Sequence, residues 1–195
     1  YKHWWLRGLK KTPKILRDEN ESAVAKFKNE LRWDTDDSWF DRSGEGLVMY
    51  AVTSNEIVVV RELLRTLKRN FEGEEYTRRL NSRVRNEGYI ELGIPGGTTT
   101  LMAATMTASP EVVSMLIESG ANVESVDVMG NDGFMFASAL GRPKNLQCWL
   151  ERVKDWDLSR QNTVLGGCAL GQAVYMGANK LETVKILLDS GASLD

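Results

Sequence analysis

The chain has 195 residues, of which 42% are hydrophobic and 27% are charged, and its formal net charge is -2. Such a chain can bury a sizeable core, which argues against a disordered protein or a small disulfide-stapled domain. The nearly neutral charge also argues against a protein that coats nucleic acid through a general excess of Lys and Arg.

The cysteines and the hydrophobicity profile exclude further classes. Cys148 and Cys168 are too few for a disulfide framework or a zinc cluster, so we expect a reducing, intracellular compartment, either the cytoplasm or an organelle interior. The most hydrophobic run, residues 57–60, is far shorter than the roughly 20 residues of a membrane-spanning helix, and no transmembrane segment is predicted. Because the chain opens at Tyr1 without Met and closes at Asp195 within a repeat, we expect a processed or trimmed chain.

Residues 1–40 are predicted to form an arm followed by a capping helix. Residues 1–17 contain six Lys or Arg and no acid, and they include Trp4 and Trp5. Trp with Lys and Arg suits a protein interface or an anionic membrane surface. The arm is therefore predicted to clamp onto a protein partner, to lie on a membrane or nucleic-acid surface, or to be a flexible tail. Apolar residues between Leu16 and Leu31 indicate the helix that follows.

Residues 70–92 carry a separate amphipathic pattern. Tyr76, Leu80 and Val84 recur every four residues among several arginines, and acidic residues precede them, an order that complements a helix dipole. We predict a short helix here, from Glu74 to Asn86. Two interpretations stay open: a solvated extra helix packed on its neighbours, or a helix that binds a partner.

The strongest pattern is an internal repeat of 33 residues. It aligns Leu101 and Ala104 with Phe134 and Ala137, and Gly120 begins a segment, GANV, that recurs near the end of the chain as GASL. Each of these two segments follows an aliphatic run, and glycine is a common terminator of helices. A period of this length is typical of stacked helical units.

On these residues the chain resembles the ankyrin repeat family, whose unit is a β-turn finger followed by two helices. Residues 41–195 can be laid out as about four divergent units, with a glycine in each finger: Gly44, Gly97, Gly130 and Gly166. The resemblance implies an all-α solenoid of helical pairs with β-turn fingers, preceded by the N-terminal helix and arm. The spacing from Ala51 to Ala104 is 53 rather than 33 residues, so the segment at about 70–92 is interpreted as an insertion.

The units depart from the family pattern at its Thr-Pro-Leu-His motif. Methionine or glycine stands in place of the histidine, at Met49, Met102, Met135 and Gly171. Helix caps are nevertheless predicted at Thr99 and Asp132 in the first helices of two units, and at Ser109 before a first-turn proline.

The resemblance implies a partner surface on the finger tips and the exposed ends of the first helices. Polar residues are expected there in a free protein, yet several positions of the later units are apolar, and exposed apolar patches usually mark interfaces. The alternative is that these side chains fold back to fill irregular loops. With the two tryptophans of the arm, the candidate partner-binding residues are Trp4, Trp5, Val128, Met129, Leu140, Val164, Leu165, Tyr175 and Met176.

Motifs for catalysis, cofactors or metals are weak. His3 is the single histidine and has no partner set for nucleophilic catalysis. The glycine-rich run at 93–99 lacks the lysine of a phosphate-binding loop, and Asp34, Asp36 and Asp37 lack the glycine and distant acid of a calcium loop. No catalytic, cofactor or metal site is predicted.

The sequence therefore predicts a non-catalytic protein-interaction module, a scaffold or accessory subunit within a multi-subunit assembly. Two alternatives stay open: a peripheral membrane adaptor that uses the basic arm of residues 1–17, and a regulatory repeat region of a longer enzyme.

Overall fold

The computed structural model describes residues 46–84, 94–177 and 179–193, and the regular secondary structure in these ranges is helical. No strand occurs in this described part; two isolated bridges join Arg83 to Thr99 and Gln161 to Cys168. The arm and capping helix predicted for residues 1–40, and the first finger, lie outside the described residues. The helices are α3 (Gly46–Thr53), α4 (Ile57–Asn70), α5 (Gly73–Leu80), α6 (Thr100–Thr107), α7 (Pro110–Glu118), α8 (Gly133–Ala139), α9 (Pro143–Arg152), α10 (Ala169–Met176) and α11 (Lys180–Asp189).

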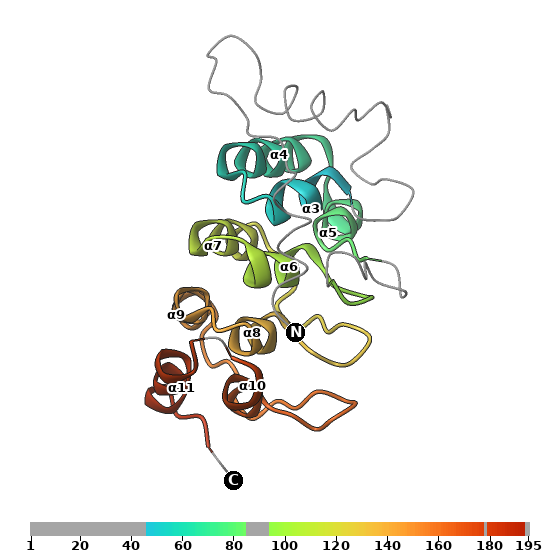
Figure 1. Ribbon diagram of the computed structural model, residues 1–195. Coiled ribbons are helices and arrows are strands. Elements are labelled where there is room, and N and C mark those ends of the chain that lie inside the picture. Colours follow the sequence, from blue (N-terminus) through green and yellow to red (C-terminus); the bar gives the residue numbers. More distant parts are fainter. Residues whose placement is uncertain (1–45, 85–93, 178, 194–195) are drawn as a thin grey trace.

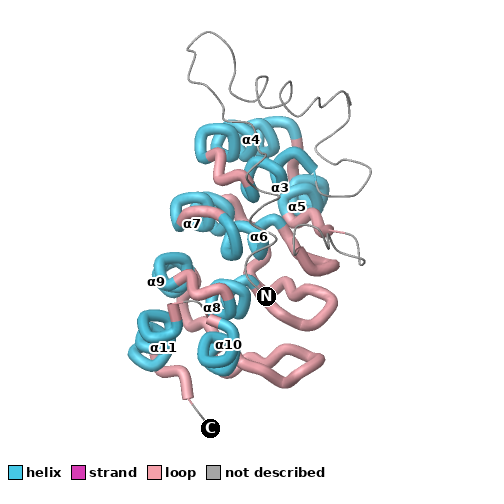
Figure 2. Tube along the Cα trace, in the orientation of Figure 1, coloured by secondary structure: helices cyan, strands magenta, loops and turns pink. Residues whose placement is uncertain are grey.

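Eight of these helices form four stacked pairs: α3 with α4, α6 with α7, α8 with α9, and α10 with α11. The first helices of the pairs contact one another in an inner layer, and the second helices contact one another in an outer layer (Figure 1). The loops that connect successive pairs project from the inner layer, on the side away from the outer layer (Figure 2). The predicted all-α architecture of helical pairs with projecting fingers is confirmed.

The two layers differ in how their helices are buried. Every residue of α8 is buried, because α8 contacts α6 on one side, α10 on the other and α9 behind it. Small residues such as Ala104, Ala137 and Ala173, all at most 1% exposed, let the inner helices approach closely. The outer helices bury only one stripe, as α4 does with Val60 and Leu63. Burial of each aliphatic side chain stabilises the folded state by roughly 1.5–3 kcal/mol relative to leaving it exposed.

Two of the predicted caps are confirmed. The Thr99 hydroxyl accepts a hydrogen bond from the Met102 N–H at 3.3 Å, and Asp132 Oδ1 accepts one from the Met135 N–H at 2.8 Å. Met102 Sδ in turn accepts a hydrogen bond from the Thr99 N–H at 3.4 Å, so a thioether completes the cap at the position where the family motif has histidine.

The cap predicted at Ser109 is wrong. The Ser109 side chain makes no capping bond, and its buried hydroxyl has no hydrogen-bond partner in the described part of the chain. Its backbone N–H donates instead to Asn55 Oδ1 at 2.8 Å, which joins the turn of the first pair to that of the second. A contact with the neighbouring unit replaces the local cap.

Polar side chains also join the later pairs at the turns between inner and outer helices. Asn145 is 2% exposed, and its Nδ2 donates to the carbonyls of Thr105 at 3.0 Å and Ala108 at 3.1 Å. Asn179 Nδ2 donates to the Gly141 carbonyl at 2.9 Å. These bonds satisfy carbonyl groups at the ends of inner helices that would otherwise be unpaired.

The inserted segment contains a helix, α5, that is shorter than predicted. It ends at Leu80, and the chain then extends so that the Val84 N–H donates to the Thr98 carbonyl at 2.9 Å. Val84 is buried with Met49, Ile94 and Ala103 rather than on a helix face. The four-residue spacing of Tyr76, Leu80 and Val84 therefore arises from a helix followed by an extended segment.

Candidate partner-binding surface

The third finger, residues 125–131, is a tight turn organised by one carboxylate. Asp127 Oδ1 accepts hydrogen bonds from the Met129 N–H at 2.9 Å and the Asn131 N–H at 2.7 Å. The Asp127 N–H donates to the Asn131 carbonyl at 2.9 Å, which closes the loop. Gly130 has a φ of 81°, a left-handed conformation that a residue with a Cβ rarely adopts.

Neighbouring fingers are joined by backbone hydrogen bonds. The Val128 N–H donates to the Gly96 carbonyl, and the Thr163 N–H donates to the Met129 carbonyl, both at 3.1 Å. These bonds bring Gly130 so close to the fourth finger, residues 161–167, that a Cβ on it would lie 2.5 Å from the Thr163 nitrogen. The finger tips are therefore held in a row.

A cluster of amide side chains fixes the base of the third and fourth fingers. Asn131 Oδ1 accepts hydrogen bonds from Asn162 Nδ2 and Gln172 Nε2, each at 3.0 Å. Asn162 Oδ1 accepts one from the Leu165 N–H at 2.8 Å. Because Asn131 and Asn162 are at most 9% exposed, the cluster is shielded from water and restricts movement of both fingers.

Comparison with known proteins agrees with this geometry. A family model described as ankyrin repeat matches residues 96–128, which span one finger tip, α6, α7 and the start of the next finger. The chain contains an ankyrin repeat. A search of curated proteins found no match. Ankyrin repeats generally mediate protein–protein interaction, and the family is typically non-catalytic.

The finger tips carry exposed apolar side chains. Val128 is 52% exposed and Met129 37% on the third finger, and Val164 is 57% and Leu165 78% exposed on the fourth. They do not fold back into the loops, the alternative that the sequence left open. Val126, 37% exposed, was not predicted and belongs to the same set. We call these five residues the finger patch.

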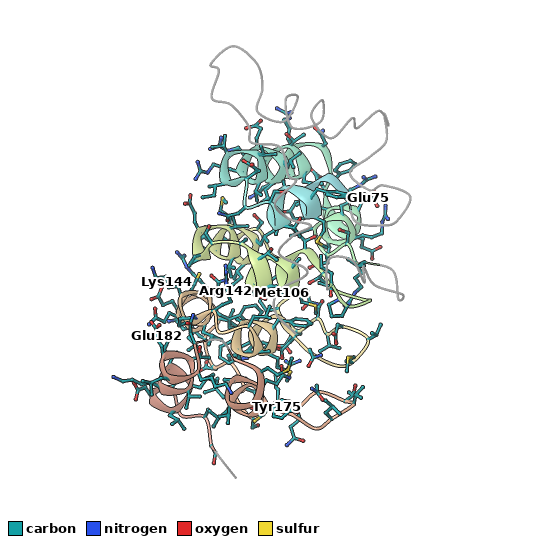
Figure 3. All side chains as sticks on the ribbon, in the orientation of Figure 1. Glu75, Met106, Arg142, Lys144, Tyr175 and Glu182 are labelled. Atoms are coloured by element: carbon teal, nitrogen blue, oxygen red, sulfur yellow. The ribbon has the colours of Figure 1, made fainter. Side chains whose placement is uncertain are left out.

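The other candidate residues lie elsewhere. Leu140 is partly buried against Met102, Met106 and Phe136, so it contributes less exposed surface than expected. Tyr175 and Met176, 86% and 62% exposed, lie in the last turn of α10, the first helix of the fourth pair, where the resemblance placed them. Figure 3 shows Tyr175 at the end of the stack. The remaining two candidates, Trp4 and Trp5, lie outside the described residues.

The cations beside the finger patch are both engaged. Arg83 Nη1 donates to the carbonyls of Gly97 at 2.9 Å and Val126 at 2.6 Å. Arg160 pairs with Glu124, its Nε lies 3.3 Å from Asp132 Oδ2, and its guanidinium stacks over Trp156 at 4.7 Å. The patch is thus apolar, with its neighbouring charges held in place.

Asp132 connects the finger region to the core. It is 1% exposed, and burial raises the pKa of its carboxyl against the opposing effects of the Met135 N–H and Arg160. Asp132 Oδ2 accepts no hydrogen bond within the described residues, but it forms an ion pair with Arg160. This ion pair anchors the loop that precedes the fourth finger. Its role is therefore structural.

Other motifs from the sequence also have structural roles. Cys148 is buried, its Sγ–H donates to the Pro110 carbonyl at 3.3 Å, and burial raises the pKa of the thiol, which keeps it protonated. The glycine-rich run ends in a finger turn at Gly97, with a φ of 76°. Within the described ranges, no cluster of three metal-ligating side chains is found and no helix is long and apolar enough to cross a bilayer. His3 and the aspartates at 34–37 lie outside those ranges.

Sequence reasoning missed a second group of exposed apolar residues, on the last helix pair. Val174, Leu181 and Leu188 are 52%, 86% and 45% exposed. The repeat alignment matches these three residues to equivalent positions in the earlier units. Their exposure at the end of the stack becomes evident only when the burial of those equivalent positions is known.

Proposed function

We propose that this chain is a scaffold or accessory subunit of a larger protein assembly, and that it binds a protein partner through the finger patch. The observation that carries the proposal is the exposure of five apolar side chains on two adjacent fingers, Val126, Val128, Met129, Val164 and Leu165. Contiguous apolar surface of this kind is usually covered by a partner.

The rigidity of the fingers supports the same function. The tips are joined to one another through the Met129 carbonyl, and their bases are fixed by the Asn131 cluster. A surface that is ordered before binding loses little conformational entropy when a partner docks. Because the flanking Arg83 and Arg160 are already engaged, we propose a partner surface that is itself mainly apolar.

Site-specific photo-crosslinking tests this function. A crosslinking amino acid is placed at Leu165, on the fourth finger, or at Val58, on α4, and crosslinked proteins in a lysate of the source cells are quantified by mass spectrometry. Val58 is a matched control because it is also an exposed aliphatic residue, 63% against 78%. We expect a defined protein to be captured from Leu165 and not from Val58.

A surface variant provides the second arm. Met129→Glu combined with Val164→Glu is expected to abolish that crosslink, because a charge at each tip opposes desolvation of an apolar contact. Thermal unfolding should be unchanged, since both side chains are exposed. Identical capture from both positions, or capture that survives the variant, would refute the finger patch as the docking surface. Capture of anionic vesicles alone, in a salt-sensitive manner, would favour the membrane-adaptor alternative.

A further inference from the structure

The last helix pair has an apolar face that the equivalent pairs do not expose. Val174 and Tyr175 of α10 are 52% and 86% exposed, and Leu181 and Leu188 of α11 are 86% and 45% exposed. We call these four residues the end face. They lie on the helices farthest from α3 along the stack (Figure 1).

In the inner layer, the same positions of the preceding units are buried. Val174 corresponds to Thr105 and Ser138, both 0% exposed, when the helix starts are aligned. Tyr175 corresponds to Met106, 7% exposed, which packs against Phe136 of the next inner helix. Figure 3 shows Met106 inside the stack and Tyr175 at its end. These positions are therefore covered when another unit follows.

The outer layer gives the same result. When the buried Leu187 is matched to Leu116 of α7 and Trp149 of α9, Leu181 corresponds to Pro110, which is partly buried, and to Pro143, which is buried. Leu188 then corresponds to Ile117 and Leu150, which are partly buried and pack against the core. Leu150 lines the groove between α9 and α11 together with Ile186 of the following outer helix. The end face continues both layers of an interface that the stack already uses.

The finger row also ends with an unused acceptor. The Gly96 and Met129 carbonyls each accept a hydrogen bond from the following finger. Leu165 holds the equivalent position, one residue before the left-handed glycine, and its carbonyl accepts no hydrogen bond in the described part of the chain. A following finger would supply the donor.

The turn after α11 has the geometry that leads into a new unit elsewhere in the chain. After α7, the Gly120 N–H donates to the Ile117 carbonyl at 2.9 Å and the Ala121 N–H to the Leu116 carbonyl at 3.0 Å. After α11, the N–H groups of Gly191 and Ala192 make the same two bonds, to Leu188 and Leu187, each at 3.0 Å. The φ angles of the two glycines, 89° and 96°, also agree. The turn after α7 directs the chain to the third finger.

We propose that the end face is the stacking surface for a fifth ankyrin-type unit of the same polypeptide, entered through the turn at Gly191. The unit places an inner helix on Val174 and Tyr175, an outer helix on Leu181 and Leu188, and a finger against the Leu165 carbonyl. Solenoids need terminal surfaces that are polar or covered, and this one is apolar. The inference does not depend on a partner at the finger patch, which the fifth finger would meet only at the Leu165 carbonyl.

The test is hydrogen exchange on the 195-residue chain and on the same chain with one consensus ankyrin unit, bearing a polar outer face, fused after Asp195. We expect amide exchange in α10 and α11 to slow at least about tenfold in the fusion, because a second neighbour suppresses local opening. The chain without the fusion provides the baseline.

Two valine variants make the test specific. Val174→Glu lies in the end face and Val128→Glu on a finger tip, and both valines are 52% exposed, so neither substitution should disturb the unfused chain. In the fusion, Val174→Glu is expected to abolish the added protection and Val128→Glu to leave it intact. Circular dichroism checks that each variant remains helical.

Three results would overturn the proposal. The first is unchanged exchange in α10 and α11 after fusion. The second is an equal effect of both valine variants in the fusion. The third is a concentration-dependent dimer of the unfused chain that Val174→Glu dissociates, since a second copy would then be the occupant of the end face.

Discussion

The α8–α9 pair inside the stack and the α10–α11 pair at its end have the same architecture but different surroundings. Every residue of α8 is buried, whereas α10 leaves Val174, Tyr175 and Met176 exposed in the last turn. At Val174 the interior helix has Ser138, a polar residue at 0% exposure, and the end helix has an apolar residue at 52%. Burial in this fold is thus decided by the neighbouring unit and not by the hydrophobicity of the residue itself.

The largest expected contrast between the two pairs is in side-chain truncation. Trp149 of α9 is 1% exposed and has its ring centroid 5.2 Å from that of Trp156 and 6.2 Å from that of Phe134. Trp149→Ala is expected to lower the free energy of unfolding by about 3–5 kcal/mol, through lost burial and a cavity. Leu188→Ala of α11, at a half-exposed position, should cost about 0.5 kcal/mol.

Urea denaturation followed by circular dichroism measures both changes, and an unchanged m-value shows that the unfolding unit is the same. Equal losses for the two variants would mean that the end face is already covered in solution. That outcome would remove the contrast between the pairs.

A smaller contrast is expected at two glycines with positive φ. Gly130 lies in the third finger, against Thr163 of the fourth, with a φ of 81°, and Gly191 follows α11, with a φ of 96°. Alanine is strained at both, at a cost of about 1–2 kcal/mol. A Cβ on Gly191 meets no atom within 4 Å, but one on Gly130 would lie 2.5 Å from the Thr163 nitrogen.

Gly130→Ala should therefore cost about 1–3 kcal/mol more than Gly191→Ala, because the fingers must separate. Chemical denaturation measures the difference, and hydrogen exchange at the Thr163 amide, which donates to Met129, reports on the finger joint. If both variants lost equal stability with the Thr163 amide still protected, the joint would be more adaptable than its geometry indicates.

The sequence predicted the helical pairs because their signals are local and repeat along the chain. Apolar spacing, Thr99 and Asp132 caps and turn glycines all act within one unit. The errors occurred where a partner distant in sequence decides the structure. Val84 leaves the helical pattern because its backbone pairs with Thr98, and Ser109 bonds to Asn55 rather than capping its own helix.

Exposure of the candidate site was harder to predict for the same reason. Val128 and Leu165 are exposed because they lie at turn tips that project from the stack. Leu140 also follows an inner helix, but it packs against Met102 of α6 and Phe136 of α8 and is partly buried. Hydrophobicity is the same in all three cases, so only the position relative to adjacent units distinguishes them.

The smallest expected contrast is the pH dependence of the helix caps. Asp132 caps α8 within the stack, and burial raises the pKa of its carboxyl, whereas Cys168 precedes α10 without a side-chain cap. The folded chain therefore binds the Asp132 proton more tightly than the unfolded chain. The contribution of this carboxyl to stability is greatest below the ordinary Asp pKa of about 3.9 and declines as pH rises through the raised value.

Asp132→Asn keeps a capping oxygen and removes the titration. The free energy of unfolding of the native chain minus that of the variant should fall as pH increases through this window, and then level off. Cys168→Ser is the control at the end pair, because it adds a capping hydroxyl worth about 0.5–1 kcal/mol. It exchanges no carboxyl, so the difference in unfolding free energy between this variant and the native chain should not depend on pH over the same range. If the difference in unfolding free energy were also independent of pH for Asp132→Asn, Arg160 and the Met135 N–H would balance the effect of burial on the carboxylate. The interior and end caps would then differ only in strength.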